Sequence, residues 1–288
     1  MSGTTIERAV SQRLNIGAAR DGILCVGTGK TAYVGKLGLV DWHRHGAPVF
    51  VVGLAGKFQL ATDTGQWLSC RAAVIPAGVR HALDVGGHPL AVFYPDPNIA
   101  TSRDLARLGA GWDAAGQILV GQTAEVGPFR ELYEHRAAPS FAGEMLDDLV
   151  DFVRAGNGPP ALDARVARVV EWLGRNPADA TSLAQLVKPD GLSVSRFLHL
   201  FSAEIGVPFR RFRIWNRLRA ASGMVLGGAN LTEAAIRAGF SDSAHFSRLH
   251  RETFGVTPSD ILRRLARASI ATHPNGDWNA RTRTMRFT

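Results

Sequence analysis

The spacing of hydrophobic residues changes once along the chain, near Asp96. Between Gly22 and Tyr94, short apolar stretches rich in valine and phenylalanine are separated by glycine turns. Short strands at regular spacing, broken by glycine, are typical of an antiparallel sandwich or barrel. The pattern therefore predicts an antiparallel β sandwich or barrel that ends at the Asp-Pro-Asn sequence of residues 96–98.

After residue 98 the hydrophobic period becomes helical. A short helix is expected over Ser102–Leu108 and a longer one over Phe141–Arg154. The longer helix has one apolar face, formed by Met145, Leu146, Leu149, Val150 and Val153. That face has two possible partners, the exterior of the barrel or a second subunit, and the sequence leaves both open.

Residues 156–160, Gly-Asn-Gly-Pro-Pro, are the expected linker between two domains. The fold class predicted is a mixed two-domain protein, with a β barrel and its following helices before an all-α domain. In the all-α domain, a long helix over Pro208–Leu226 starts at a proline and is followed by two glycines. The expected boundaries are 1–155 for the first domain, 156–162 for the linker, 163–268 for the second domain and 269–288 for a disordered tail.

Two segments of the all-α domain have similar sequences, GLSVSRFLHLFSAEIGVP from Gly191 and GFSDSAHFSRLHRETFGVTP from Gly239. A close repeat is one structural unit used twice. Each copy begins with a glycine turn, continues as an amphipathic helix and follows a shorter helix, over Ser182–Val187 or Thr232–Ala238. We therefore expect two helix-turn-helix units joined by the long helix. That helix, at ~27 Å, would place both units on one face of a DNA duplex, whose turn is ~34 Å.

The basic charge of the chain belongs to the part that holds the repeat. Residues 161–288 contain 19 Lys and Arg against 10 Asp and Glu, a net charge of +9, whereas residues 1–160 contain 14 against 15, a net charge of −1. Such a surface attracts a phosphate backbone, and arginine suits phosphate and guanine contacts. An arginine-rich solvated surface would carry the same charge, so it is the combination with the repeat that favours DNA.

A family resemblance covers about Thr181 to Arg263, under a third of the chain. Its residues are the two helix-turn-helix units, AGFSDSAHFSR at 238–248 and FGVTPSDILR at 254–263. This region resembles the DNA-binding domain of AraC/XylS-type transcription regulators. The resemblance implies a homodimer that binds double-stranded promoter DNA in response to a small-molecule effector, with RNA polymerase as a partner if the protein is an activator. His199 and His250 stand where the family usually has arginine and phenylalanine.

The residues expected to face DNA lie opposite the core stripe of the second helix in each unit. Arg248 is the candidate for a bidentate contact with guanine, and a phosphate contact is its alternative. Arg196 and Arg210 are expected to contact the DNA backbone. The full set of candidates is Ser195, Arg196, Leu198, His199 and Arg210 with the first unit, and Ser243, Ala244, His245, Ser247 and Arg248 with the second.

Three histidines of the barrel are candidates for one site. His43 and His45 are two residues apart and so point to the same side of a strand, and His81 follows the Pro-Ala-Gly-Val-Arg turn of residues 76–80. These two pieces resemble the halves of the cupin motif, which implies that the histidines converge inside the barrel. Three imidazoles can hold a divalent metal. The carboxylate of metal cupins is absent from residues 46–50, so a metal-free ligand pocket and a purely structural role remain alternatives.

We expect the barrel to bind a polar or aromatic organic effector. The candidate lining residues are Trp42, His43, His45, Phe50, Trp67, His81 and Phe93. If the histidines point inward, Arg44 and Arg80, which alternate with them, point outward. The competing hypothesis is a metal-binding barrel that acts as a metal sensor or metalloenzyme, and a third is a constitutive architectural DNA-binding protein.

Several classes of protein are not supported by the sequence. There is no GxSxG or HExxH motif and no glycine-rich phosphate loop, so we expect no enzymatic activity. No apolar run reaches the ~18 residues that a membrane-spanning helix needs. The N-terminus lacks the order of charges of a signal peptide, which favours a cytoplasmic protein without membrane contact.

Overall fold

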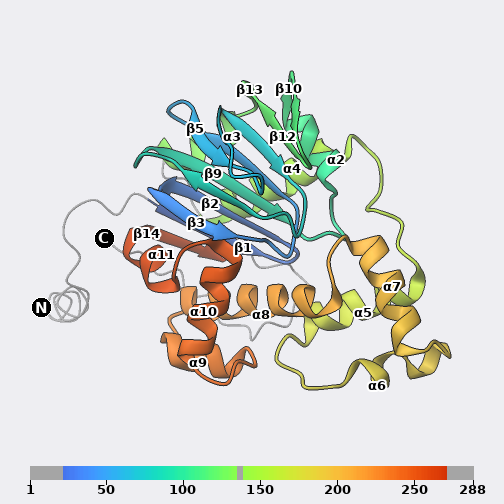
Figure 1. Cartoon of the computed structure of the whole chain (residues 1–288). Coiled ribbons are helices and arrows are strands. Elements are labelled where there is room, and N and C mark those ends of the chain that lie inside the picture. The colour runs from blue at the N-terminus through green and yellow to red at the C-terminus, as the bar shows by residue number, and fades with distance from the viewer. Residues whose placement is uncertain (1–21, 135–138, 271–288) are drawn as a thin grey trace, which may run out of the picture.

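The computed structural model of the chain describes residues 22–134 and 139–270. Within these residues a β-rich body lies against a helical body, and α8 (Phe209–Leu226) runs along the boundary between them (Figure 1). The predicted two-domain mixed fold is therefore confirmed, although the two bodies share one hydrophobic core that includes Val92 of the barrel and Trp215 of α8. No helix in the described ranges has the length and apolar character required to cross a bilayer.

The β-rich body contains two main sheets. The larger sheet has the spatial order β11 (Asp113–Ala115), β12 (Ile118–Gly121), β7 (Ala72–Ile75), β4 (Val49–Gly53), β9 (Pro89–Pro95), β2 (Lys30–Lys36), β1 (Gly22–Gly27) and β14 (Leu265–Ile270). The smaller sheet has the order β3 (Leu39–His43), β8 (His81–Asp84), β5 (Phe58–Ala61) and β6 (Trp67–Cys70). A separate pair joins β10 (Gly109–Ala110) to β13 (Thr123–Ala124).

Successive side chains of the larger sheet enter two different cores, as the period of two in a strand requires. Val49 and Val51 of β4 face the interior between the sheets, whereas Phe50 and Val52 face the opposite side. That outer face is covered by α2 (Ser102–Leu105), the 3₁₀ turn η1 (Ala106–Leu108), α3 (Gly127–Glu134) and α4 (Pro139–Arg154).

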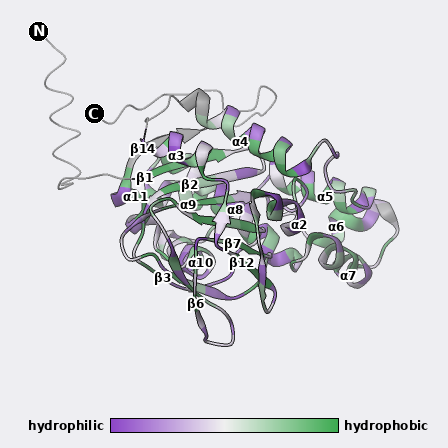
Figure 2. Ribbon diagram, turned by 90° about the horizontal axis from the view of Figure 1, so that it is seen from above, coloured by the Kyte–Doolittle hydropathy of each residue, from purple (hydrophilic) through white to green (hydrophobic). Residues whose placement is uncertain are grey.

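The apolar face of α4 packs on the outside of the barrel within the same chain. All five of its predicted residues, from Met145 to Val153, are buried there beside Phe50 and Phe93. Hydrophobic and hydrophilic residues alternate along this helix with its turns (Figure 2). Of the two partners that the sequence left open, the structure therefore gives the barrel exterior.

The helical body begins with α5 (Ala164–Arg175), and the other helices are α6 (Leu183–Val187), the 3₁₀ turn η2 (Lys188–Asp190), α7 (Val194–Ile205), α8, α9 (Leu231–Arg237), α10 (Ser243–Phe254) and α11 (Pro258–Arg264). The two repeats use the same local chemistry. Side-chain oxygens of Ser193 and Asp242 cap the starts of α7 and α10. Both helices end at a left-handed glycine, Gly206 with φ 80° and Gly255 with φ 72°.

The sequence prediction is wrong about the C-terminal boundary. Residues 265–270 form β14, which pairs in parallel with β1, so residues 269 and 270 belong to a strand and not to a disordered tail. This strand also makes the end of the second domain the edge strand of the larger sheet of the first domain. The partner strand lies more than 200 residues earlier, and a pairing of that range leaves no mark on local periodicity. Residues 271–288 lie outside the described residues.

Candidate DNA-binding surface and barrel site

The first recognition helix is α7, which exposes its predicted DNA-facing residues. Phe197 and Phe201 are fully buried, and Phe201 packs edge-on against Phe212 of α8. On the other side of the helix the four candidates are exposed, Ser195, Arg196, Leu198 and His199.

The second recognition helix is α10, where Phe246 and His250 are buried on the core side. Ala244 and Arg248 are exposed, and Ser243, His245 and Ser247 are half-buried. The Nδ1 of His245 lies 3.0 Å from the hydroxyl oxygen of Ser241 in the preceding turn. Arg210, the fifth candidate of the first group, is exposed on the first turn of α8.

The C-terminal half of α10 docks on strand β3 of the barrel. The backbone N–H of Arg44 donates to the carbonyl of Glu252 at 3.3 Å, and the N–H of Asp41 donates to the carbonyl of Gly255 at 3.2 Å. The Arg251 guanidinium also forms an ion pair with Asp41 at 3.2 Å. The last turn of α10 is therefore held by the backbone of the barrel.

Two glycines allow this close approach. A Cβ on Gly255 would lie 2.5 Å from the carbonyl oxygen of Asp41 and 2.8 Å from Nδ1 of His43. A Cβ on Gly46 would lie 2.5 Å from the Cβ of Trp215 on α8. All three distances are shorter than real Cβ contacts, so each position requires glycine.

A buried carboxylate fixes α8 against the barrel. Asp96, which follows β9, accepts a hydrogen bond from the indole N–H of Trp215 at 2.8 Å and forms an ion pair with Arg219. The Asp96 and Arg219 side chains are only 7% and 11% exposed. Because a buried charge is costly unless it is paired, this pair stabilises one placement of α8 over others.

The three histidines of the barrel meet at one buried point. The ring centroids of His43 and His81 are 4.2 Å apart, those of His43 and His45 4.6 Å, and those of His45 and His81 4.8 Å. Their potential metal-ligating atoms all lie within 4.8 Å of one another. The convergence implied by the cupin resemblance is thus present in the structure.

Hydrogen bonds orient these imidazoles. Nδ1 of His43 lies 2.6 Å from the carbonyl oxygen of Asp41, and Nδ1 of His81 lies 3.0 Å from that of Val79. A carbonyl oxygen only accepts, so each Nδ1 donates and leaves Nε2 with a lone pair. Nε2 of His45 lies 3.2 Å from the Tyr94 hydroxyl. Among the described residues, Nδ1 of His45 and Nε2 of His81 have no hydrogen-bond partner.

Burial keeps all three rings neutral. It lowers the pKa of His43 to about 4, and it lowers the pKa of His45 and His81 well below the ordinary value, with the neighbouring histidines adding to the effect. A neutral imidazole with a free ring nitrogen is the form that binds a metal, and His81 offers Nε2 and His45 offers Nδ1. The residues present therefore fit a divalent cation with nitrogen ligands, which would act there as a Lewis acid or as a structural centre.

The helical body closes the barrel over this histidine cluster. Phe254 of α10 lies 6.2 Å from His45 and 6.0 Å from Tyr94 between ring centroids. Trp215 of α8 lies 5.5 Å from Tyr94 and 5.6 Å from Phe254. A change in the size or charge of the histidine cluster would therefore change the packing of α8 and α10 against the barrel.

The predicted effector-lining residues do not all share one cavity: the prediction is wrong for Phe50, Phe93 and Trp67, whereas Trp42 and His43 line one pocket. Phe50 and Phe93 lie on the outer face of the larger sheet, in the core under α4. Trp67 is 46% exposed on β6. Trp42 lies outside the barrel, where the Arg80 guanidinium is 4.5 Å from its ring centroid. Only the three histidines of the predicted set meet inside the barrel.

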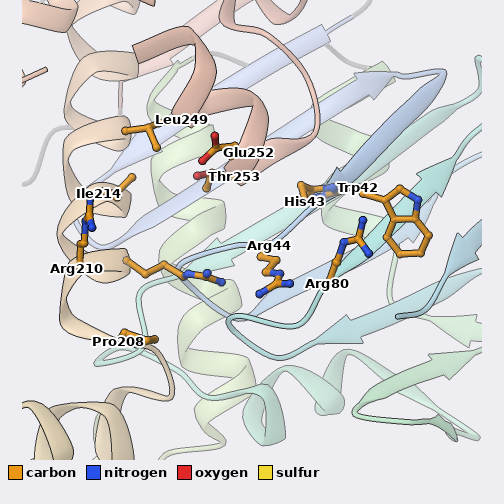
Figure 3. A pocket seen from close by; sticks show the side chains of 11 residues that line it. Trp42, His43, Arg44, Arg80, Pro208, Arg210, Ile214, Leu249, Glu252 and Thr253 are labelled. Atoms are coloured by element: carbon orange, nitrogen blue, oxygen red, sulfur yellow. The ribbon is translucent and has the colours of Figure 1, made fainter. Parts of the chain in front are cut away.

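A pocket of about 510 Å³ lies where the two bodies meet, beside the docked end of α10 (Figure 3). Its walls come from β3 and the residues after it, the turn before β8, the first turns of α8 and the last turns of α10. Arg44 and Arg80 line this pocket and are exposed, so they lie outside the barrel, as the alternation with the histidines predicts.

Comparison with known proteins identifies the helical body. Residues 188–264 match the family model of a helix-turn-helix domain. The arabinose operon regulatory protein of Escherichia coli K12 is 26% identical over 146 residues, which cover 50% of this chain and 49% of that protein. The transcriptional activator NphR of a Rhodococcus species is 35% identical over 131 residues, which cover 42% of this chain and 38% of that protein. The chain carries an AraC-type helix-turn-helix domain.

The two-domain arrangement also has solved counterparts. ToxT from Vibrio cholerae superposes with a TM-score of 0.51 at 14% identity, over 82% of this chain and 99% of ToxT. An apo structure of a ToxT variant from the same species gives a TM-score of 0.56 at 14% identity, over 83% of this chain and 98% of that protein. At this identity the likeness shows the fold, a barrel followed by an AraC-type domain. The chain spans about half or less of the length of the curated relatives named above.

Sequence reasoning missed the residues that join the barrel to the AraC-type domain. Asp96 was visible only as part of a turn, Asp-Pro-Asn, that ends the strand region. Its partners Trp215 and Arg219 lie 119 and 123 residues later. No local spacing in the sequence shows that a buried aspartate and an arginine of a distant helix are partners.

Proposed function

We propose that the protein is a sequence-specific DNA-binding transcription regulator whose barrel binds a small-molecule effector. The observation that carries the proposal is the pair of capped helix-turn-helix units at the two ends of α8, in a region of net charge +9. The relatives named above, regulators of transcription by their names, support the same function.

The two units divide the task of recognition. Arg248 on α10 is exposed and suited to guanine, while His199 occupies the equivalent position on α7, counted from the terminal glycines. Ser195 and Leu198 in the first unit, and Ser243, Ala244, His245 and Ser247 in the second, complete the proposed base-facing set. Arg196 and Arg210 would contact phosphates and contribute affinity without sequence information.

The proposed route of regulation runs from the barrel to the second unit. An effector changes DNA affinity only if it binds two states of the protein unequally, by ~1–3 kcal/mol. The docked end of α10 and the Asp96 contact with α8 are the places where such states would differ. A homodimer, and contact with RNA polymerase if the protein is an activator, belong to this proposal through the family resemblance.

A second candidate function is metal sensing by the barrel, which the cluster of three neutral histidines favours. His43, His45 and His81 would hold the metal, and Phe254 of α10 packs beside His45, so a metal held there would act on the AraC-type domain through α10. Elemental analysis of the full chain beside a His43→Ala/His81→Ala variant separates the two. Near-stoichiometric metal that is lost in the variant supports metal sensing, and its absence from both leaves the organic effector.

The proposed function is tested by selecting binding sites for the full chain from a random DNA library. Enrichment of one sequence motif is the expected result. Arg248→Ala should change the preferred bases, whereas Arg210→Ala should keep the motif and reduce the salt dependence of binding by about one phosphate contact. If no motif is enriched over the random pool, sequence-specific DNA binding is excluded.

A further inference from the structure

The pocket between the barrel and the AraC-type domain is lined by four arginines. Arg44 and Arg80 come from the barrel, and Arg210 and Arg211 come from the first turn of α8. Figure 3 shows Arg44 in the space between the two bodies and Arg80 at the edge of the pocket beside the Trp42 ring. Glu252 of α10 is the one carboxylate in the lining. The pocket therefore has an excess of positive charge from both of its principal walls.

In the described part of the chain, none of the four arginines forms a close ion pair. Arg80 lies over the Trp42 ring, and Asp41, which interacts with Arg80 at longer range, forms its ion pair with Arg251. Burial and the charge of Arg44 lower the pKa of Arg211. Arg44, Arg80 and Arg210 are exposed and Arg211 is half-buried, so solvent screens part of their mutual repulsion and the guanidinium groups are accessible to an anion.

The start of α8 adds to the positive potential. Pro208, which caps this helix of 18 residues, lines the pocket and makes no side-chain capping bond. The first N–H groups of a helix lack intrahelical acceptors, and the helix dipole places partial positive charge there. A helix start beside a set of guanidinium groups is a favourable place for a carboxylate or phosphate oxygen.

We propose that this pocket binds a small organic polyanion with at least two acidic groups, carboxylates or phosphates. One acidic group would be held by Arg44 and Arg80 on the barrel, and the other by Arg210, Arg211 and the start of α8. The volume of about 510 Å³ lies in the range of ~300–1,000 Å³ that small-molecule sites occupy. Ile214 and Leu249 supply an apolar surface for the carbon skeleton between the charged groups.

Such a ligand would tie the two bodies together, because its two ends are held by different domains. Its consequence for DNA affinity rests on the proposed function, since Arg210 and α10 are shared with the proposed DNA surface. By linkage, the polyanion and DNA would then change each other's affinity by the same factor. The binding itself does not depend on DNA and is measured without it.

The test uses the full chain with sodium pyrophosphate and sodium citrate as probes, at ionic strength matched with sodium chloride. Calorimetric titration and thermal unfolding should show saturable binding and an increase in Tm for at least one probe. Arg44→Gln and Arg80→Gln should each weaken that binding tenfold or more. The control is Arg175→Gln, which removes the same charge from an exposed arginine on α5 and should leave binding unchanged. Circular dichroism of each variant establishes that it is folded.

The preference between the probes separates phosphate from carboxylate ligands, and either preference supports the site. Binding that is equally strong in Arg44→Gln and Arg80→Gln, or that disappears for all proteins at matched ionic strength, overturns the proposal. So does a third outcome, in which neither probe binds but Arg44→Gln lowers DNA affinity and its salt dependence, because the pocket would then contact the DNA backbone. Saturable probe binding by a chain that enriches no DNA motif would leave the site intact and remove the proposed function instead.

Discussion

The two helix-turn-helix units have the same local design and different surroundings. Each recognition helix starts at a capping side chain and ends at a left-handed glycine. Around Gly206 of the first unit, an added Cβ would meet open space, whereas around Gly255 of the second it would meet the barrel at 2.5 Å. The α7 helix packs against other helices, and the end of α10 is bonded to β3. The difference shows that the recognition helix of the second unit is bonded to the barrel at its end, whereas that of the first is not bonded there at Gly206.

The largest effect should come from removing the carboxylate that holds α8. Asp96→Ala leaves the Arg219 guanidinium and the Trp215 indole N–H buried without their acceptor, which should cost about 3–5 kcal/mol of unfolding free energy. Hydrogen exchange should show α10 losing the protection that its docking gives, so that the two units become alike. Chemical denaturation gives the free energy. A loss below about 1 kcal/mol would mean that the Asp96 contact does not hold the domains together.

The glycines at the ends of the two recognition helices provide a matched pair. Gly206→Ala should cost about 1 kcal/mol, because alanine is strained at positive φ. Gly255→Ala adds a clash with Asp41 and His43 to the same strain, for a total of about 3 kcal/mol. Equal losses in the two variants, measured by denaturant unfolding, would contradict the docking of α10 on β3.

His250 of α10 stands at the position that Phe201 occupies in α7, counted from the terminal glycines. Burial lowers the pKa of His250 to about 4 from 6.5. Between about pH 6.5 and 4 the imidazole of His250 is protonated in the unfolded chain but not in the folded chain. The free energy of unfolding therefore falls as the pH drops from about 6.5 towards 4. In the wild-type protein this protonation should lower the free energy of unfolding by about 1–3 kcal/mol over that range. We expect His250→Phe to lack this pH-dependent decrease. The check is unfolding free energy at several pH values, and the same pH dependence in both proteins would refute the assignment.

The smallest effect should come from the exposed ion pair of Arg251 with Asp41. At the protein surface such a pair contributes up to about 1 kcal/mol, and salt screens it. Arg251→Gln should therefore change Tm by a few degrees at most and leave the α10 docking bonds in place. Increasing salt should reduce the difference between the two proteins. A large loss would mean that the side-chain pair, and not the backbone contact, holds α10 on β3.

The parts of the fold that could be predicted are those with a local chemical mark. Serine, asparagine and aspartate caps and terminal glycines delimit the helices of the AraC-type domain, and the H-x-H spacing predicts that two imidazoles share a side of the chain. For a strand that is buried on both faces, the sequence could not predict which side chains point into the barrel and which point to its outside. All five residues of β4 are buried, so no alternation tells Phe50 from Val51, and Phe50 was wrongly placed in the barrel interior. Contacts such as Asp96 with Trp215 depend on packing between domains, which local patterns do not encode.

The pairing of β14 with β1 has a consequence for synthesis on the ribosome. The edge of β1 is completed by Leu265–Ile270, which are made more than 200 residues after it. An open strand edge is a template for wrong pairing with another chain. During synthesis the outer edge of β1 therefore stays unpaired until the segment that follows the DNA-binding helices has been made. A truncated chain that stops before Leu265 keeps this edge unpaired. The larger sheet therefore gains its edge strand only after the AraC-type domain has been translated.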